Sequence, residues 1–82
     1  MGIRFTTSAD RHGIAHEDAI YAMIHSTGTE SVASAKSLPT RVFVGHPHLQ
    51  TERYIEVIAS VLGADIVIFH VMELSDLYRH LT

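Results

Sequence analysis

Glu56 and His70 are the side chains in this sequence whose types and spacing best suit acid–base chemistry. His70 lies in the run Asp65–Met72, which is the most strand-like stretch of the chain. Apolar residues alternate onto both faces of this run, which predicts a strand that is covered on both sides. His70 is the polar side chain inside the run, and a buried imidazole needs a hydrogen-bond partner.

Glu56 is the candidate for that partner. It lies in the preceding run, Arg53–Ser60, and Gly63 separates the two runs. If the runs form a hairpin folded about Gly63, Glu56 stands directly opposite His70 on the same face of the sheet. A shift of one residue would break this pairing, so the prediction depends on the register.

The same register divides the hairpin into two faces. It predicts a core face made of Ile55, Val57, Ala59, Val67, Phe69 and Val71. The opposite face is half apolar and carries Tyr54, Glu56, Ile58, Ile66, Ile68, His70 and Met72. This second face is more apolar than an exposed surface should be, which predicts a homodimer or a partner that covers it.

A carboxylate and an imidazole in contact can divide the roles of general base and general acid between them. The same contact also occurs as a purely structural pair, because ion-pair networks perturb titration as active sites do. The residues alone leave both interpretations open for Glu56 and His70.

Other histidines and the tyrosines give weaker signals. His12 beside Gly13 could approach a phosphate, although a hydrogen bond to a backbone carbonyl at the turn is the preferred interpretation. His46 and His48 could begin a metal site, but no third ligand stands at a recognisable spacing. We therefore interpret them as part of a solvated loop and predict no metal and no cofactor. Aromatic rings that could stack on nucleobases, or lie in the core, are Tyr21, Tyr54 and Tyr78.

The periodicity of the apolar residues, together with the residues that form turns and helix caps, predicts the elements that position these side chains. The prediction is an edge strand at Ile3–Phe5, a helical turn at Ala9–His12, a helix at His16–Ser26, a loop at Thr27–Thr40, strands at Arg41–Gly45, Arg53–Ser60 and Asp65–Met72, and a last short helix after Ser75. This order predicts an α+β fold, with N-terminal helices packed on a small antiparallel β-meander and a short C-terminal helix.

Composition sets the broad class. The chain has 82 residues, which predicts a single domain, residues 1–82. It has no cysteine, and no apolar run approaches the length of a membrane span, so we expect a cytoplasmic protein that does not associate with membranes. The formal net charge of −3 argues against an indiscriminate nucleic-acid binder.

The step Arg11-His12-Gly13-Ile14, followed by Glu17-Asp18-Ala19, resembles the pattern of BrnT-type toxins. In those toxins a Lys/Arg-His-Gly-Val/Ile step leads into an acidic helix start. The further matching pieces are Val42–Gly45, Ile55-Glu56-Val57, Val67–His70 and the tail Leu77-Tyr78-Arg79. The resemblance implies a RelE-like fold, endoribonuclease activity without a metal, and neutralisation by an antitoxin protein.

The resemblance also implies roles for particular residues. Metal-free RNA cleavage needs a base for the 2′-hydroxyl, an acid for the leaving oxygen and a cation for the charge on phosphorus. Glu56 and His70 would supply base and acid, and Arg79 or Arg41 the cation. Candidates for contacts with the RNA substrate are Arg41, His12 and Tyr54.

Two other functions stay open. The acidic balance favours a non-catalytic protein-interaction domain of the same fold, a degenerate relative of the toxins that forms a dimer. The excess of histidine, with 7 in the chain, is compatible with a sensor that binds a metal or a small ligand.

Overall fold

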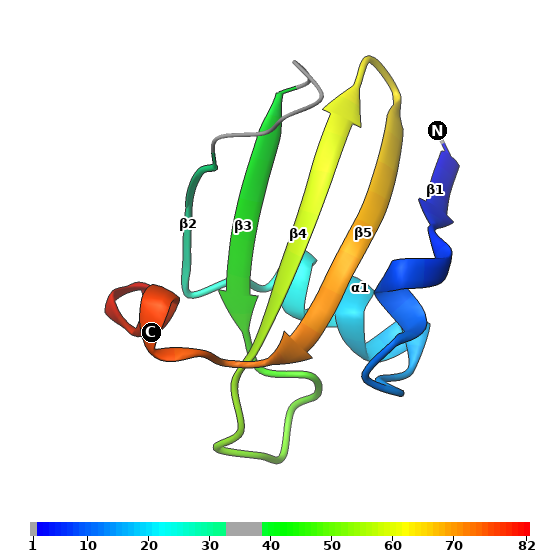
Figure 1. Ribbon diagram of the computed structural model, residues 1–82. Coiled ribbons are helices and arrows are strands. Elements are labelled where there is room, and N and C mark those ends of the chain that lie inside the picture. Colours follow the sequence, from blue (N-terminus) through cyan, green and yellow to red (C-terminus); the bar gives the residue numbers. More distant parts are fainter. Residues whose placement is uncertain (1, 33–38) are drawn as a thin grey trace.

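The structure is a computed structural model that describes residues 2–32 and 39–82 (Figure 1). These residues form one five-stranded sheet with the strand order β1-β5-β4-β3-β2. The strands are β1 (Gly2–Phe5), β2 (Gly28–Ser31), β3 (Thr40–Gly45), β4 (Ile55–Leu62) and β5 (Asp65–Glu73). The helical elements are the 3-10 helix η1 (Thr7–Asp10), the α-helix α1 (His16–Ile24) and the 3-10 helix η2 (Asp76–Leu81).

The sheet is mixed. The pairs β2–β3, β3–β4 and β4–β5 are antiparallel. At the other edge of the sheet, β1 pairs parallel to β5. The pairing of β1 places Ile3 beside Ile66 and Phe5 beside Ile68. The N-terminal edge strand predicted from the sequence is therefore present, and it adds two apolar side chains to the core.

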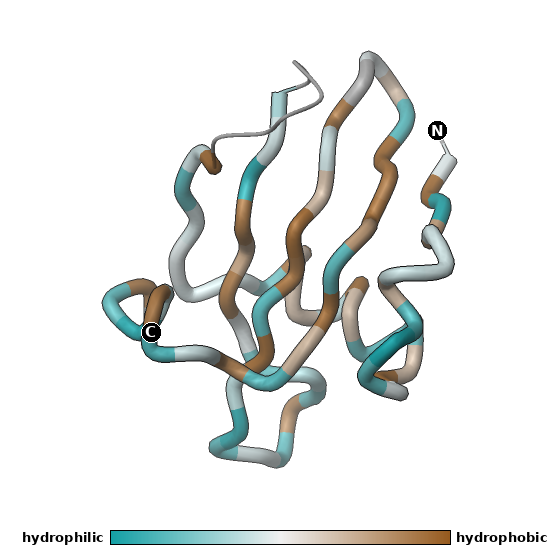
Figure 2. Tube along the Cα trace, viewed as in Figure 1, coloured by the Kyte–Doolittle hydropathy of each residue, from teal (hydrophilic) through white to brown (hydrophobic). Residues whose placement is uncertain are grey.

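The core lies between the sheet and α1, which passes behind β4 and β5 in Figure 1. The helix begins with Glu17 and Asp18 in its first turn, where its dipole favours negative charge. Ala15 stands at its N-cap and gives it no side-chain hydrogen bond. The buried residues of this layer are Ala9, Ala19, Ala22, Met23, Ile55, Val57, Ala59, Ile68 and Val71. Apolar residues accordingly concentrate along the central strands (Figure 2).

A β-bulge in β5 corrects the predicted register. Near the turn, Ala59 pairs with Ile68, whereas one step later Ile58 pairs with His70, so Phe69 is the extra residue. Glu56 pairs with Met72 rather than with His70, and the predicted pairing of Ile58 with Ile68 is wrong.

The bulge also corrects the predicted faces. Because the alternation of side chains is interrupted at Phe69, Ile68 lies in the core behind the sheet while His70 stays on the face of Glu56. Ile66 packs against the same core, and Val67 pairs with Ser60 on the opposite face. The apolar surface predicted from Ile58, Ile66, Ile68 and Met72 therefore does not form as one patch.

The predicted fold class is wrong. The chain does not pack N-terminal helices on a three-stranded meander in a RelE-like manner, because the described residues contain a single α-helix and a five-stranded mixed sheet. The segment Thr27–Thr40, interpreted as a loop, contributes β2, which pairs with β3 from Gly28 to Ser31. Residues 33–38 of that predicted loop lie outside the described residues.

The sequence does not predict β2 as a strand because its residues are polar. Its residues are Gly, Thr, Glu and Ser, and they are partly or largely exposed. An edge strand has a neighbour on one side only, so it needs little apolar character. The meander of β3, β4 and β5 is confirmed as the centre of the sheet.

The close contact between Gly45 and α1 gives a prediction about stability. A Cβ added at Gly45 would lie 2.5 Å from the carbonyl oxygen of Ala22, inside the buried helix. We expect Gly45→Ala to lower the free energy of unfolding by about 1–3 kcal/mol, measured by urea denaturation, because the helix must shift away from the sheet.

Gly28→Ala is the matched control for this prediction. Its added Cβ would meet the carbonyl oxygen of Leu81 at 2.4 Å, but Leu81 belongs to η2, a short 3-10 helix with no buried residue, which can shift more easily than α1. We expect Gly28→Ala to cost less stability than Gly45→Ala. Equal losses in the two variants would contradict this account of the helix contact.

Candidate functional site

Glu56 is a buried carboxylate on the face of the sheet opposite α1. Its exposed fraction is 3%, and both of its oxygens have a hydrogen-bond donor. Oε2 lies 3.0 Å from Nε2 of His70, and Oε1 accepts a 2.8 Å hydrogen bond from the backbone N–H of Ser75. The contact between Glu56 and His70 predicted from the sequence is thus confirmed, across a diagonal of the ladder rather than directly opposite.

The bulge and the N-terminal segment hold β5 in the form that this contact needs. β1 ends beside the bulge, where the N–H of Thr6 donates to the carbonyl of Ile68 at 2.9 Å. The hydroxyl of Ser8 then donates to the carbonyl of Phe69 at 2.9 Å. The irregular backbone just before His70 is therefore hydrogen-bonded from η1 and the residue before it. Bulges of this kind re-aim side chains beside functional sites.

The contact with Glu56 also fixes which nitrogen of His70 carries a proton. An ionised carboxylate only accepts hydrogen bonds, so Nε2 of His70 must be the donor. In the neutral ring the lone pair is then on Nδ1. The His70 side chain is 31% exposed, whereas the Glu56 side chain is 4% exposed, so of the two only His70 is open to contact with a substrate.

His12 lies beside His70. The two rings meet edge to face with their centroids 6.2 Å apart. His12 is exposed in the turn after η1, and Gly13 ends that turn with a positive φ of 69°. The ends of the turn are tied together by a hydrogen bond between His16 and Asp10, and His16 stacks on Phe5.

Among the described residues Glu56, His70 and His12 lie together, and neither predicted cation forms a hydrogen bond or ion pair with any of them. Arg79 is exposed on η2 and pairs with Asp76. Arg41 pairs with Ala59 in the ladder, so it lies on the face of the sheet that α1 covers, where it donates to the hydroxyls of Thr29 and Ser31.

Tyr54 flanks the site from the connection between β3 and β4. Its ring stacks on His46 with the centroids 4.2 Å apart. The N–H of Leu74 donates to the carbonyl of Tyr54 at 3.1 Å, so the ladder between β4 and β5 continues past Ile55 to this residue. Tyr54 therefore stands at the end of β4 that carries Glu56.

The C-terminal segment closes one side of the site. After β5 the chain crosses in front of the sheet to η2, which lies beside β2 (Figure 1). The hydroxyl of Thr27 donates to the carbonyl of Leu81 at 2.9 Å, and His80 pairs with Glu30 at 3.1 Å. Leu77 on this helix is 69% exposed, so it does not pack on the sheet.

Tyr78 is a residue of the site that the sequence analysis considered only for stacking or core packing. Burial of its phenol raises the pKa of Tyr78 above the ordinary value, and the negative charges of Glu56 and Glu30 raise it further. Its position near Glu56 arises from the path of residues 74–78 across the sheet, for which no sequence signal was available.

The raised pKa of Tyr78 predicts a dependence of stability on pH. The folded protein keeps this proton after the unfolded chain has lost it, so the contribution is complete below about pH 10 and is lost as the pH rises through the folded pKa. We expect the free energy of unfolding to fall more steeply above pH 10 in the wild type than in Tyr78→Phe. Urea denaturation between about pH 9 and pH 11 measures the difference.

Tyr21→Phe removes the same number of phenols and leaves Tyr78 in place, so its pH profile should follow the wild type. If Tyr78→Phe also followed the wild type, the raised pKa of Tyr78, and with it the effect of its burial and of Glu56 and Glu30, would be refuted.

The described residues contain no group of three or more His, Cys, Asp or Glu side chains arranged to hold a metal ion. His46 and His48 are therefore not part of such a group. Within residues 2–32 and 39–82, no helix is both long and apolar enough to cross a membrane.

Comparisons of the chain with protein-family models, with curated proteins and with solved structures gave no significant match. The functional conclusion therefore rests on the geometry of Glu56, His70 and His12.

Proposed function

We propose that this protein is a metal-independent endoribonuclease that cleaves single-stranded RNA. The observation that supports it is the hydrogen bond from His70 to the buried Glu56, with the ring of His12 beside it. Two imidazoles at one exposed position, one of them oriented by a carboxylate, provide a base and an acid for transfer of a phosphoryl group.

In the proposed reaction, Nδ1 of His70 removes the proton of a 2′-hydroxyl, and the resulting oxygen attacks the adjacent phosphorus. The bond from phosphorus to the 5′-oxygen breaks, and protonated His12 gives a proton to that leaving oxygen. The products are a 2′,3′-cyclic phosphate and a 5′-hydroxyl. Glu56 acts as a positioning residue, because its buried oxygens are occupied by His70 and Ser75.

Arg11 supplies the positive charge for the phosphate in this proposal. It immediately precedes His12 in the same exposed turn, and it forms no ion pair with another residue of the described part of the chain. The cation roles that the sequence suggested for Arg79 and Arg41 are not used, because these residues have partners elsewhere.

The test is incubation of purified protein with single-stranded RNA in the presence of a chelator. We expect cleavage to persist, and phosphorus NMR of the products to show a 2′,3′-cyclic phosphate. His12→Ala should lose activity, whereas His48→Ala, which removes an exposed histidine from another loop, should not. Intact RNA after incubation, with or without added metal, would overturn the proposal.

We further propose that the protein acts in the cytoplasm as a toxin of the BrnT type and that an antitoxin protein holds it inactive. The chain would form a homodimer or a hetero-oligomer with that antitoxin. Arrested growth on expression of the chain alone, and relief by co-expression of a protein encoded next to it, would support this biological setting. If the chain cleaves RNA but its expression does not slow growth, the toxin proposal is contradicted and the ribonuclease proposal is retained.

A protein-interaction domain is the second candidate. The observation that favours it is the exposure of two large apolar side chains, Leu49 at 84% and Leu77 at 69%, on a chain with a net charge of −3. This function would be supported if the protein cleaves RNA under no condition tested and binds a protein partner through Leu49 or Leu77.

A further inference from the structure

The connection between β3 and β4, residues 46–54, carries an aromatic pair that the proposed chemistry does not use. The rings of His46 and Tyr54 have centroids 4.2 Å apart and planes inclined by 32°. Both residues are partly exposed. A partly exposed pair of flat rings offers a surface on which a nucleobase can stack.

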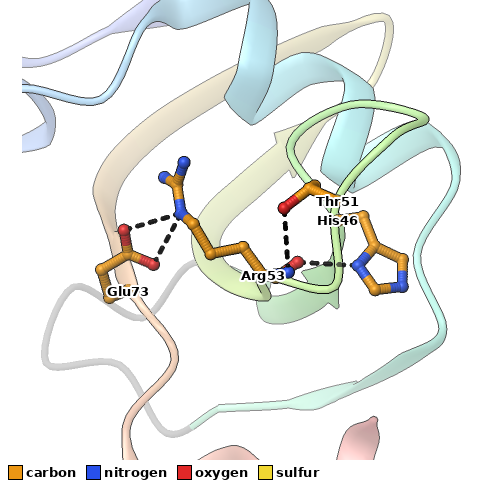
Figure 3. A network of polar contacts seen from close by, with 4 residues as sticks. All are labelled: His46, Thr51, Arg53 and Glu73. Atoms are coloured by element: carbon orange, nitrogen blue, oxygen red, sulfur yellow. Dashed lines mark hydrogen bonds and ion pairs between the residues drawn. The ribbon is translucent and has the colours of Figure 1, made fainter.

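A set of polar contacts fixes the position of this pair (Figure 3). Nδ1 of His46 lies 2.7 Å from the carbonyl oxygen of Arg53, and the N–H of Arg53 donates to the hydroxyl of Thr51 at 3.1 Å. Nε of the Arg53 side chain lies 2.9 Å and 3.2 Å from the two oxygens of Glu73 at the end of β5. Two of these contacts are internal to the loop, and the ion pair of Arg53 with Glu73 joins the loop to β5.

The same contacts determine the hydrogen-bonding character of His46. A carbonyl only accepts, so Nδ1 is the donor to Arg53, and in the neutral ring Nε2 is an acceptor. Among the described residues Nε2 has no hydrogen-bond partner. The ring pair thus combines a stacking surface with one available acceptor, which suits the N–H edge of a nucleobase.

The ring pair also lies at the correct end of the sheet. Tyr54 is two residues before Glu56, and the hydrogen bond from Leu74 keeps its backbone extended along β5. His70 pairs with Ile58, four residues from Tyr54, so at the usual rise per residue of a strand the level of His70 is about 13 Å from Tyr54 along β4. A base on the ring pair would therefore belong to a nucleotide on the same RNA strand near the phosphate that reaches His70, not to the nucleotide directly at it.

We propose that His46 and Tyr54 form a subsite for one nucleobase of single-stranded RNA, near the phosphate that is cleaved. The base stacks on the ring pair and donates an N–H to Nε2 of His46. This inference deepens the proposed ribonuclease function and rests on it for the identity of the ligand.

The experiment measures binding without cleavage. The probe is a fluorescein-labelled, random-sequence, ten-nucleotide 2′-O-methyl RNA, which lacks the hydroxyl needed for cleavage, and the readout is fluorescence anisotropy. We expect Tyr54→Ala to weaken binding about tenfold, and Tyr54→Phe, which keeps the ring, to bind like the wild type. His46→Ala should also weaken binding.

Tyr21→Ala is the matched control. Tyr21 forms a similar ring pair with His25, with centroids 4.4 Å apart, but on α1 behind the sheet. Its loss should leave binding of the probe unchanged. Circular dichroism and thermal unfolding establish that each variant is folded.

Three results would overturn the subsite: no binding by the wild type, unchanged binding by folded Tyr54→Ala, or an equal loss in Tyr21→Ala. If RNA is cleaved but Tyr54→Ala binds normally, the subsite fails and the ribonuclease stands. If the probe binds through Tyr54 but no RNA is cleaved, the subsite stands and the catalytic proposal fails.

Discussion

His70→Ala should lower the rate of RNA cleavage by about a hundredfold or more. In the proposed reaction Nδ1 of His70 takes the proton of the attacking 2′-hydroxyl, and no other described side chain shares the hydrogen bond to Oε2 of Glu56. The loss should appear mainly in kcat, because substrate contacts from His12 and the ring pair of His46 and Tyr54 are retained.

The variant also leaves a buried carboxylate with one donor fewer, which costs stability as well as activity. His70→Gln separates the two effects, because its amide N–H can still donate to Glu56 while no titrating group remains. We expect His70→Gln to be more stable than His70→Ala in urea but equally inactive. Full activity in His70→Gln would exclude His70 as the base.

The contact between Glu56 and His70 is predictable from the sequence for a sound physical reason, although the predicted register is wrong. A polar side chain inside an apolar strand needs a partner, and that requirement holds whichever residue stands opposite. The extra residue Phe69 changed the pairing while keeping His70 on the face of Glu56. The predicted contact is therefore present although the predicted register is wrong by two positions.

The bulge itself could not be predicted from alternation in one run. Asp65–Met72 is apolar on both faces, so the run does not reveal where the alternation is interrupted. The constraint comes from other elements: Ile68 must meet the core that Phe5 and α1 complete, while His70 must reach Glu56. Only a residue inserted between them satisfies both.

The remaining parts of the site depend on contacts between distant segments. His12 reaches His70 because β1 pairs parallel to β5 and delivers the following turn to that end of the sheet. Arg41 was assigned to the substrate from its residue type, but the alternation along β3 places it on the opposite face. Neither outcome is encoded in a local pattern, since both follow from which strands are neighbours.

Glu56→Gln should reduce cleavage by about a hundredfold or more although it changes few atoms, because it selects the wrong tautomer of His70. The amide has one oxygen and one NH₂ group. The N–H of Ser75 requires an acceptor, so the oxygen of Gln must face Ser75 and the NH₂ must face Nε2 of His70. Nε2 then has to accept, and the proton of the neutral ring moves to Nδ1, the nitrogen proposed as the base.

Nitrogen NMR of the histidine ring tests this argument independently of activity. In the wild type the neutral ring of His70 should carry its proton on Nε2, and in Glu56→Gln on Nδ1. Glu30→Gln is the matched control, because it makes the same change in a carboxylate that pairs with His80. It should leave the tautomer of His70 and the cleavage rate unchanged. A proton on Nδ1 in the wild type would remove Nδ1 as the base, and with it the role of Glu56 in orienting the ring.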